Sequence, residues 1–90
     1  MYIKLRQLLE KETYPHSYVH KFIGPLNQEF LAAVDALQSQ FAHLDLLVES
    51  RQSQKGGYIA FTLTFLAKHA EEIIVLVKAT AELPGLKMIL

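Results

Sequence analysis

The sequence predicts an α+β domain in the order βαββαβ, with two helices on one face of a four-stranded antiparallel sheet. Two segments, residues 26–41 and 68–82, carry apolar side chains at spacings of three and four, as amphipathic helices do. Residues 58–65 alternate between large apolar and small or polar side chains, which indicates a strand with one buried face. Crossover connections of one hand place both helices on the same side of the sheet, so the order predicts a ferredoxin-like sandwich.

The first strand is expected over residues 18–23, which are aromatic and β-branched and are followed by Gly24 and Pro25. Side chains alternate along a strand, so Tyr18, His20 and Phe22 share one face. We expect this aromatic face to point toward the core.

The first helix follows and begins near Pro25 or Asn27, because proline suits the first helical turn and asparagine is a good N-terminal cap. His43 marks its expected end. Its apolar stripe is formed by Leu26, Phe30, Ala33, Val34, Leu37 and Phe41.

The second and third strands are expected at residues 44–52 and 58–65, joined by a turn whose two glycines can adopt positive φ. The alternation along the third strand predicts its two faces. The core face carries Ile59, Phe61, Leu63 and Phe65, and the open face carries Tyr58, Ala60, Thr62 and Thr64.

The second helix is expected over residues 68–82, with no good N-terminal cap and a stop at Leu83-Pro84-Gly85. Residues 86–90 are interpreted as a short last strand. Residues 1–13 are assigned to an N-terminal segment that precedes a single domain, residues 14–90. The predicted buried stripe of the second helix is Ala70, Ile73, Ile74, Val77 and Ala81.

Composition excludes several classes of protein. Nine Lys and Arg residues balance nine Asp and Glu residues, so no net field attracts nucleic acid or an anionic membrane. The chain has no cysteine, which excludes disulfides, thiolate metal sites and cysteine nucleophiles. It has no apolar run of about 18 residues and no recognisable signal peptide. We therefore expect a cytoplasmic protein that does not contact a membrane.

The stretch SQKGGYIA, residues 53–60, raises the alternative of an RNA-binding strand. RNA-recognition domains of this topology stack bases on two or three aromatic side chains of the open sheet face. Here Tyr58 is the one ring expected on that face, because Phe61 and Phe65 point into the core. We therefore interpret the stretch as a hairpin, and we expect no nucleic-acid binding.

Several short motifs occur in a fixed order along the chain. The segment LRQLLE is followed by Tyr14-Pro15 and Tyr18, Lys21-x-x-Gly24, Ser53-x-Lys55-Gly56-x-Tyr58 and a final Lys87-Met88-Ile89-Leu90. In this order and spacing the chain resembles the YbeD-like family of small bacterial proteins of unknown function, relative to which Lys11-Glu12-Thr13 is an insertion. The resemblance implies an ACT-like ferredoxin fold, similar to regulatory domains of amino-acid metabolic enzymes, and a suspected link to lipoate metabolism.

Four histidines are candidates for a metal site. His16 and His20 would lie about 13 Å apart at roughly 3.3 Å per residue of strand, which is too far to share an ion. His43 and His69 have no carboxylate pair at ligand spacing. Since no nucleophile or acid–base arrangement is recognisable either, we expect no metal, no cofactor and no enzymatic activity.

The loop between the first strand and the first helix is a candidate ligand site. Free backbone N–H groups at a helix start favour an anion such as a carboxylate. In ACT domains, to which the resemblance points, the corresponding loop helps to hold an amino-acid ligand at a subunit interface. The alternative is that the loop merely turns the chain. Its residues are Gly24, Pro25, Leu26 and Asn27.

The open face of the sheet is predicted to bind a partner, because it is less polar than a face that contacts only water. The partner would be a second copy of the chain or another protein. Alternatively, the N-terminal segment folds back and covers the face. Val75, on the outer side of the second helix, is a further apolar feature. The predicted surface is Val19, Lys21, Ile23, Tyr58, Ala60, Thr62, Thr64 and Ile89, with Lys87 beside it.

The sequence therefore favours a non-enzymatic, ACT-like binding module. In the first hypothesis it senses a small carboxylate metabolite and regulates a metabolic enzyme. In the second it is a protein–protein adaptor that uses the open sheet face without a ligand. RNA binding is the third and least favoured hypothesis.

Overall fold

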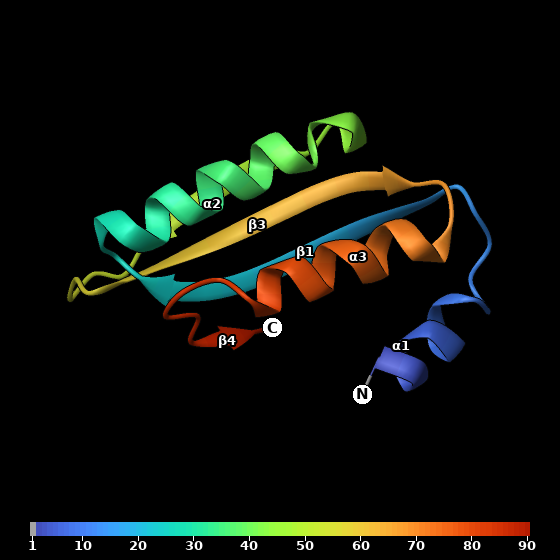
Figure 1. The fold of residues 1–90 in the computed structure, drawn as a ribbon, viewed down its shortest axis with the longest axis horizontal. Coiled ribbons are helices and arrows are strands. Elements are labelled where there is room, and N and C mark those ends of the chain that lie inside the picture. The colour runs from blue at the N-terminus through green and yellow to red at the C-terminus, as the bar shows by residue number, and fades with distance from the viewer. Residues whose placement is uncertain (1) are drawn as a thin grey trace.

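The computed structural model describes residues 2–90, with the side chain of Tyr2 left out, so Met1 of the predicted N-terminal segment lies outside the described residues. After the first helix, the elements follow the predicted βαββαβ order (Figure 1). Within residues 2–90, no helix is long and apolar enough to cross a bilayer. The elements are α1 (Tyr2–Leu9), β1 (His16–Pro25), α2 (Gln28–Gln40), the 3-10 turn η1 (Ala42–Leu44), β2 (Leu47–Gln52), β3 (Tyr58–Ala67), α3 (Ala70–Ala81) and β4 (Met88–Ile89).

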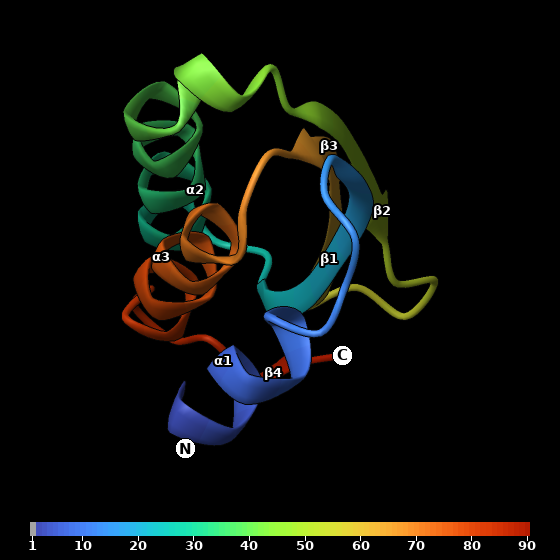
Figure 2. The ribbon, with the colours of Figure 1, turned by 90° about the vertical axis from the view of Figure 1, so that its right-hand side faces the viewer.

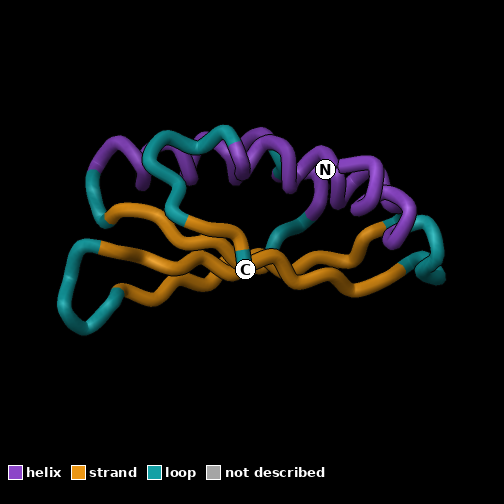
Figure 3. Tube along the Cα trace, turned by 90° about the horizontal axis from the view of Figure 1, so that it is seen from below, coloured by secondary structure: helices purple, strands orange, loops and turns teal. Residues whose placement is uncertain are grey.

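The four strands form one sheet in the order β2-β3-β1-β4, and every neighbouring pair is antiparallel. The two central strands, β1 and β3, pair along their whole length, from His16 opposite Ala67 to Pro25 opposite Tyr58. Figure 3 shows the helices in one layer and the sheet in another, and no described segment of the chain covers the far side of the sheet. The predicted ferredoxin-like sandwich is confirmed.

The core lies between the sheet and the helices, and three phenylalanine rings from different elements meet in it. Phe22 and Phe61 stack with their ring centroids 5.6 Å apart, and Phe30 of α2 packs against both. The predicted inward faces of β1 and β3 are confirmed, because His20, Phe22, Ile59, Phe61, Leu63 and Phe65 are all buried. The α2 stripe is confirmed as well, with Phe30, Val34, Leu37 and Phe41 buried.

The second strand begins later than predicted, at Leu47 and not at Leu44. Leu44 ends η1, with its N–H bonded to the carbonyl of Phe41, and Asp45 adopts a left-handed conformation at φ 55°. This turn follows α2, which ends at Gln40 and not at His43. Leu44 is buried as the anchor of the turn, so its apolar character reflects core packing and not strand pairing.

The buried stripe of α3 differs from the prediction at its C-terminal end, where Ala81 is exposed and Leu76 and Thr80 are buried. Thr80 tolerates burial because its hydroxyl donates a hydrogen bond to the carbonyl of Leu76. At the other end of α3 no side chain caps the helix, as predicted, but the Glu72 carboxylate accepts a hydrogen bond from the Lys68 N–H.

The N-terminal segment forms a helix, α1, that packs against α3 on the helix side of the sheet (Figure 2). Leu9 is buried in the core, its carbonyl accepts a hydrogen bond from the Tyr14 hydroxyl, and Arg6 pairs with Glu71 of α3 at 2.6 Å. The alternative that this segment covers the open face of the sheet is therefore wrong.

Candidate functional site

The open face of the sheet has a regular layout that follows from strand register. From Ala60 to Thr64, strand β3 presents small side chains there, and its two neighbours in the sheet, β1 and β2, present longer ones. We call the resulting shallow depression along β3 the sheet trough. Its cross-strand rows are Ile23–Ala60–Arg51, Lys21–Thr62–Glu49 and Val19–Thr64–Leu47.

Large apolar side chains on this face are exposed to solvent. Val19 is 53% exposed, Leu47 61% and Tyr58 43%. Isolated exposed apolar residues are normal, but several on one uncovered face of a sheet, at both ends of the trough, favour an interaction surface. Because α1 lies on the other side of the sheet, no described part of the chain covers this group.

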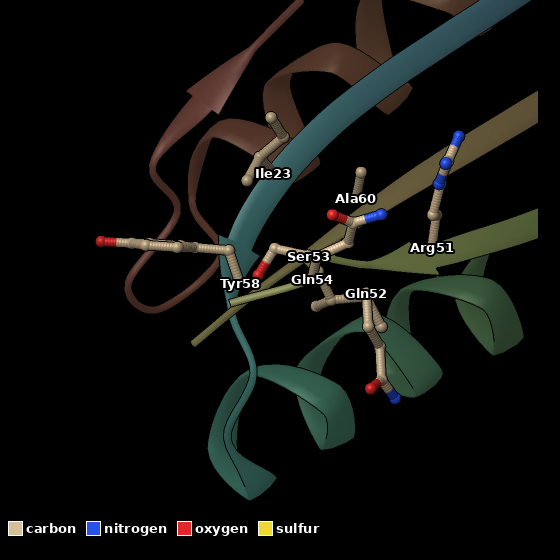
Figure 4. A pocket seen from close by; sticks show the side chains of 8 residues that line it. Ile23, Arg51, Gln52, Ser53, Gln54, Tyr58 and Ala60 are labelled. Carbon is tan, nitrogen blue, oxygen red and sulfur yellow. The ribbon is translucent and has the colours of Figure 1, made fainter. Parts of the chain in front are cut away.

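A hollow of about 260 Å³ lies at the hairpin end of the sheet trough. Figure 4 shows Ala60 between Tyr58 on one side and Arg51 on the other, with Ile23 projecting from β1. Because Ala60 has only a methyl group, the surface dips at this point. A second hollow, of about 470 Å³, shares Ala60 and Arg51 and continues past Lys21, Glu49 and Thr62. The trough is thus continuous over two rows of the sheet.

The charges of the sheet trough are mainly positive and uncompensated. Within residues 2–90, no ion pair involves Lys21, Glu49 or Arg51. The Lys87 ammonium lies over the Tyr58 ring, 4.0 Å from its centroid, at the rim of the hollow. The face therefore presents more cationic than anionic groups, although the chain as a whole is balanced.

The predicted hairpin is confirmed, and it positions Tyr58. Gly56 and Gly57 both have positive φ, at 74° and 89°, and the Ser53 N–H bonds to the Tyr58 carbonyl at 3.0 Å. The Gly57 carbonyl accepts a hydrogen bond from the Leu26 N–H at 2.9 Å, which ties the hairpin to the end of β1. The hydrogen bonds of the turn thus hold Tyr58 at the rim of the hollow.

The predicted ligand loop is organised differently from expectation. Gly24 and Pro25 belong to β1, opposite Ile59 and Tyr58, so they do not form a free loop. The Leu26 N–H is bonded to Gly57. The Asn27 side chain accepts a hydrogen bond from the Phe30 N–H at 2.8 Å, which confirms the predicted cap. Several donors proposed for a carboxylate are therefore engaged within the chain, and ligand binding at Gly24–Asn27 stays a prediction.

One residue of the predicted partner surface is misplaced. Ile89 pairs with Phe22, whose side chain points into the core, so Ile89 lies on the helix side of the sheet. Met88 pairs with Ile23, so Met88 and not Ile89 lies on the open face. Sequence reasoning also missed the contribution of β2, namely Leu47, Glu49 and Arg51, although their alternation along residues 47–51 could have indicated it.

One histidine, His20, lies in the core, and the other three are partly or fully exposed. His20 is buried, and its Nε2 lies 3.1 Å from the Thr80 hydroxyl. Since that hydroxyl donates to Leu76, His20 is the donor to Thr80, and burial lowers its pKa to about 4. His43 and His69 line one hollow of about 280 Å³ between α2 and α3. Across the described residues, no three His, Asp or Glu side chains are placed to hold a metal ion.

Two solved structures share the fold. An uncharacterized protein from Thermotoga maritima aligns with a TM-score of 0.69 at 13% identity, over 83% of this chain and 94% of that one. The ACT domain of GTP pyrophosphokinase from Chlorobium tepidum aligns with a TM-score of 0.63 at 12% identity, over 82% and 94%. At these identities the likeness shows the fold alone. The chain is thus a small α+β module with an ACT-like fold.

The chain belongs to the protein family of unknown function DUF493, whose model matches residues 10–90. A UPF0250 protein from Pasteurella multocida (strain Pm70) is 28% identical over 87 residues, which cover 97% of this chain and 96% of the relative. The resemblance to the YbeD-like family is confirmed. The family match begins just after α1, so it covers the whole βαββαβ unit.

Proposed function

We propose that this chain is a non-enzymatic, cytoplasmic binding module of the regulatory ACT-like type, which acts by docking another protein on the open face of its sheet. The observation that carries the proposal is the uncovered apolar face itself. Val19, Leu47 and Tyr58 are exposed there, and α1 packs on the opposite side of the sheet. Burying such side chains against a partner would remove apolar surface from water, at roughly 25 cal/mol for each Å².

A binding role is supported by the state of two side chains that could do chemistry. His20 is buried and bonded to Thr80, and Glu71 is paired with Arg6. A general base needs access to its substrate, and a buried histidine that is already hydrogen-bonded has none. The exposed groups of the sheet trough are instead arranged in flat cross-strand rows, which suit contact with a protein surface.

The proposal favours an adaptor over a carboxylate sensor at Gly24–Asn27. The amides of Leu26 and Phe30 are occupied by the Gly57 carbonyl and the Asn27 side chain. A sensor at that loop would have to bind through the remaining amides of the first helical turn, next to the carboxylate of Glu29. Like charges at a helix start oppose the binding of an anion.

A matched pair of variants tests the proposal. Ala60→Trp fills the hollow of the sheet trough, and Ala32→Trp places the same side chain on the exposed surface of α2. We expect proteins captured from the source bacterium by the wild-type chain to be captured equally by Ala32→Trp and lost with Ala60→Trp. Equal capture by all three chains would show that the open face is not the docking surface.

A further inference from the structure

We propose that the docked element is a protein segment that combines one large apolar side chain with a neighbouring carboxylate. The inference rests on the proposed function and names the chemistry of the partner. The apolar side chain would enter the hollow above Ala60, and the carboxylate would bind Arg51.

The hollow has the size and lining for a single anchoring side chain. Its volume is about 260 Å³, its floor is Ala60, and Ile23 and Tyr58 supply apolar walls. Small-molecule sites enclose most of their ligand, which an open trough on a sheet face does not. A shallow hollow in a flat face instead resembles the sites where one residue of a partner provides much of the binding energy.

Arg51 is placed to receive a carboxylate next to that anchor. It borders both hollows of the sheet trough, and none of the described residues forms an ion pair with it. A guanidinium group binds a carboxylate through two parallel hydrogen bonds, which fixes orientation as well as adding energy. An acidic residue adjacent to the anchor would therefore be held in a defined position.

The surrounding charges favour an acidic partner. The side chains of Lys21, Arg51 and Lys87 lie on or beside the open face, and Glu49 is the acidic side chain that lines the same hollow. Complementary charge speeds association and excludes partners of the wrong sign. A second copy docked face to face would bring more cationic than anionic side chains together, because a two-fold interface pairs a surface with itself. The charges thus argue against the second copy as occupant.

The first experiment identifies the occupant directly. Tyr58→p-benzoylphenylalanine puts a photo-crosslinking ring at the rim of the hollow with little change of shape. The same residue at Leu31, which is exposed on α2, is the control. The full chain is made in the source bacterium and irradiated, and the crosslinked peptide is sequenced by mass spectrometry. We expect a Tyr58-specific protein adduct whose segment carries a large apolar residue within a few positions of Asp or Glu.

The second experiment uses a synthetic peptide of the crosslinked segment. Arg51→Gln removes the cation and is expected to weaken peptide binding about tenfold, in line with the loss of a charge-assisted hydrogen bond. Lys11→Gln, which removes an exposed cation outside the sheet, should leave the affinity unchanged. Replacing the acidic residues of the peptide by their amides should weaken binding to the wild type but not further weaken binding to Arg51→Gln.

The outcomes separate the inference from the proposed function. A segment without a carboxylate, a second copy of this chain, or an affinity that Arg51→Gln does not change would overturn the inference and leave docking on this face intact. Adducts with RNA, or no adduct at Tyr58 above the Leu31 control, would overturn both.

Discussion

The Lys87 ammonium lies over the ring of Tyr58, 4.0 Å from its centroid. This contact joins the segment before β4 to the start of β3. It places a cation on the ring of Tyr58, which among the described side chains is the aromatic ring of the open face. A cation over an aromatic ring stabilises the pair by about 0.5–1 kcal/mol at an exposed site. Lys87 therefore occupies a surface on which a base would have to stack.

We predict no appreciable binding of single-stranded RNA at physiological salt. Bases bind without sequence preference where several rings and many phosphate contacts are available. Here Tyr58 stands alone and shares its ring with Lys87, and the chain has no excess of basic residues. Fluorescence anisotropy with a labelled oligonucleotide measures this. Tight binding that Tyr58→Ala abolishes would restore the RNA-recognition hypothesis.

We predict that Phe61→Ala lowers the free energy of unfolding by about 3–5 kcal/mol, because it leaves a cavity between Phe22 and Phe30. Thr62→Ala, the next residue on the opposite face of β3, is the control and should cost far less. Urea denaturation of both variants provides the comparison. A loss below about 1 kcal/mol for Phe61→Ala would mean that the ring does not fill the core.

Gly24 is predicted to be required for packing and not for ligand binding. A Cβ at this position would overlap the ring of Phe30, which is fully buried, so the ring or the backbone would have to shift. Gly24→Ala should therefore lower the free energy of unfolding by about 1–3 kcal/mol, as overpacking of a core does. Combining it with Phe30→Leu tests the cause by a double-mutant cycle. If the losses of unfolding free energy in the two single variants simply add in the double variant, the ring of Phe30 is not the source of the strain.

Stability should depend on pH through His20. Its pKa is lowered to about 4 by burial, so the unfolded chain, with a histidine pKa near 6.5, binds a proton more readily. Neutral His20 contributes to the free energy of unfolding above about pH 6.5, and this contribution is lost as the pH falls toward 4. Between pH 7 and pH 5 the free energy of unfolding should therefore fall by about 2 kcal/mol through His20.

The matched variant for this prediction is His20→Leu, whose unfolding free energy should change less over the same range of pH. Keeping the measurement above pH 5 limits the contribution of carboxylates such as Glu71, whose pKa is lowered by its hydrogen bond to Arg6. Parallel pH profiles for the wild type and His20→Leu would show that His20 is not the titrating group.

The parts of the fold that were predictable from the sequence are those that strict periodicity determines. The alternation along β3 assigned Phe61 and Tyr58 to opposite faces, and both assignments are confirmed. The phase of α3 was harder to predict, because Thr80 is buried through bonds to Leu76 and His20 that arise only in the tertiary structure. From the sequence alone, a polar residue at such a position is expected to face solvent.

The candidate site was predictable only in part, because it depends on how β4 pairs with β1 and on where α1 packs. β4 has two residues, so no pattern within it distinguishes the face of Met88 from that of Ile89; pairing with β1 decides it. Leu5 and Leu9 indicate one apolar stripe on α1, but local spacing does not specify whether that stripe packs on α3 or on the open sheet face. The structure places it on α3, and the open face is uncovered as a result.

Thiol accessibility in living cells tests the central claim most directly, since the chain has no cysteine of its own. Val19→Cys places a thiol on the open face, and Leu31→Cys places one at an exposed position on α2. Each variant is expressed from its own chromosomal locus, and its rate of alkylation by N-ethylmaleimide is measured in cells and after purification. We predict that Cys at position 19 reacts more slowly in cells than in the purified chain, because a partner covers it, whereas Cys at position 31 reacts equally fast in both. Equal rates at position 19 would contradict the claim that the open face of the sheet docks a partner.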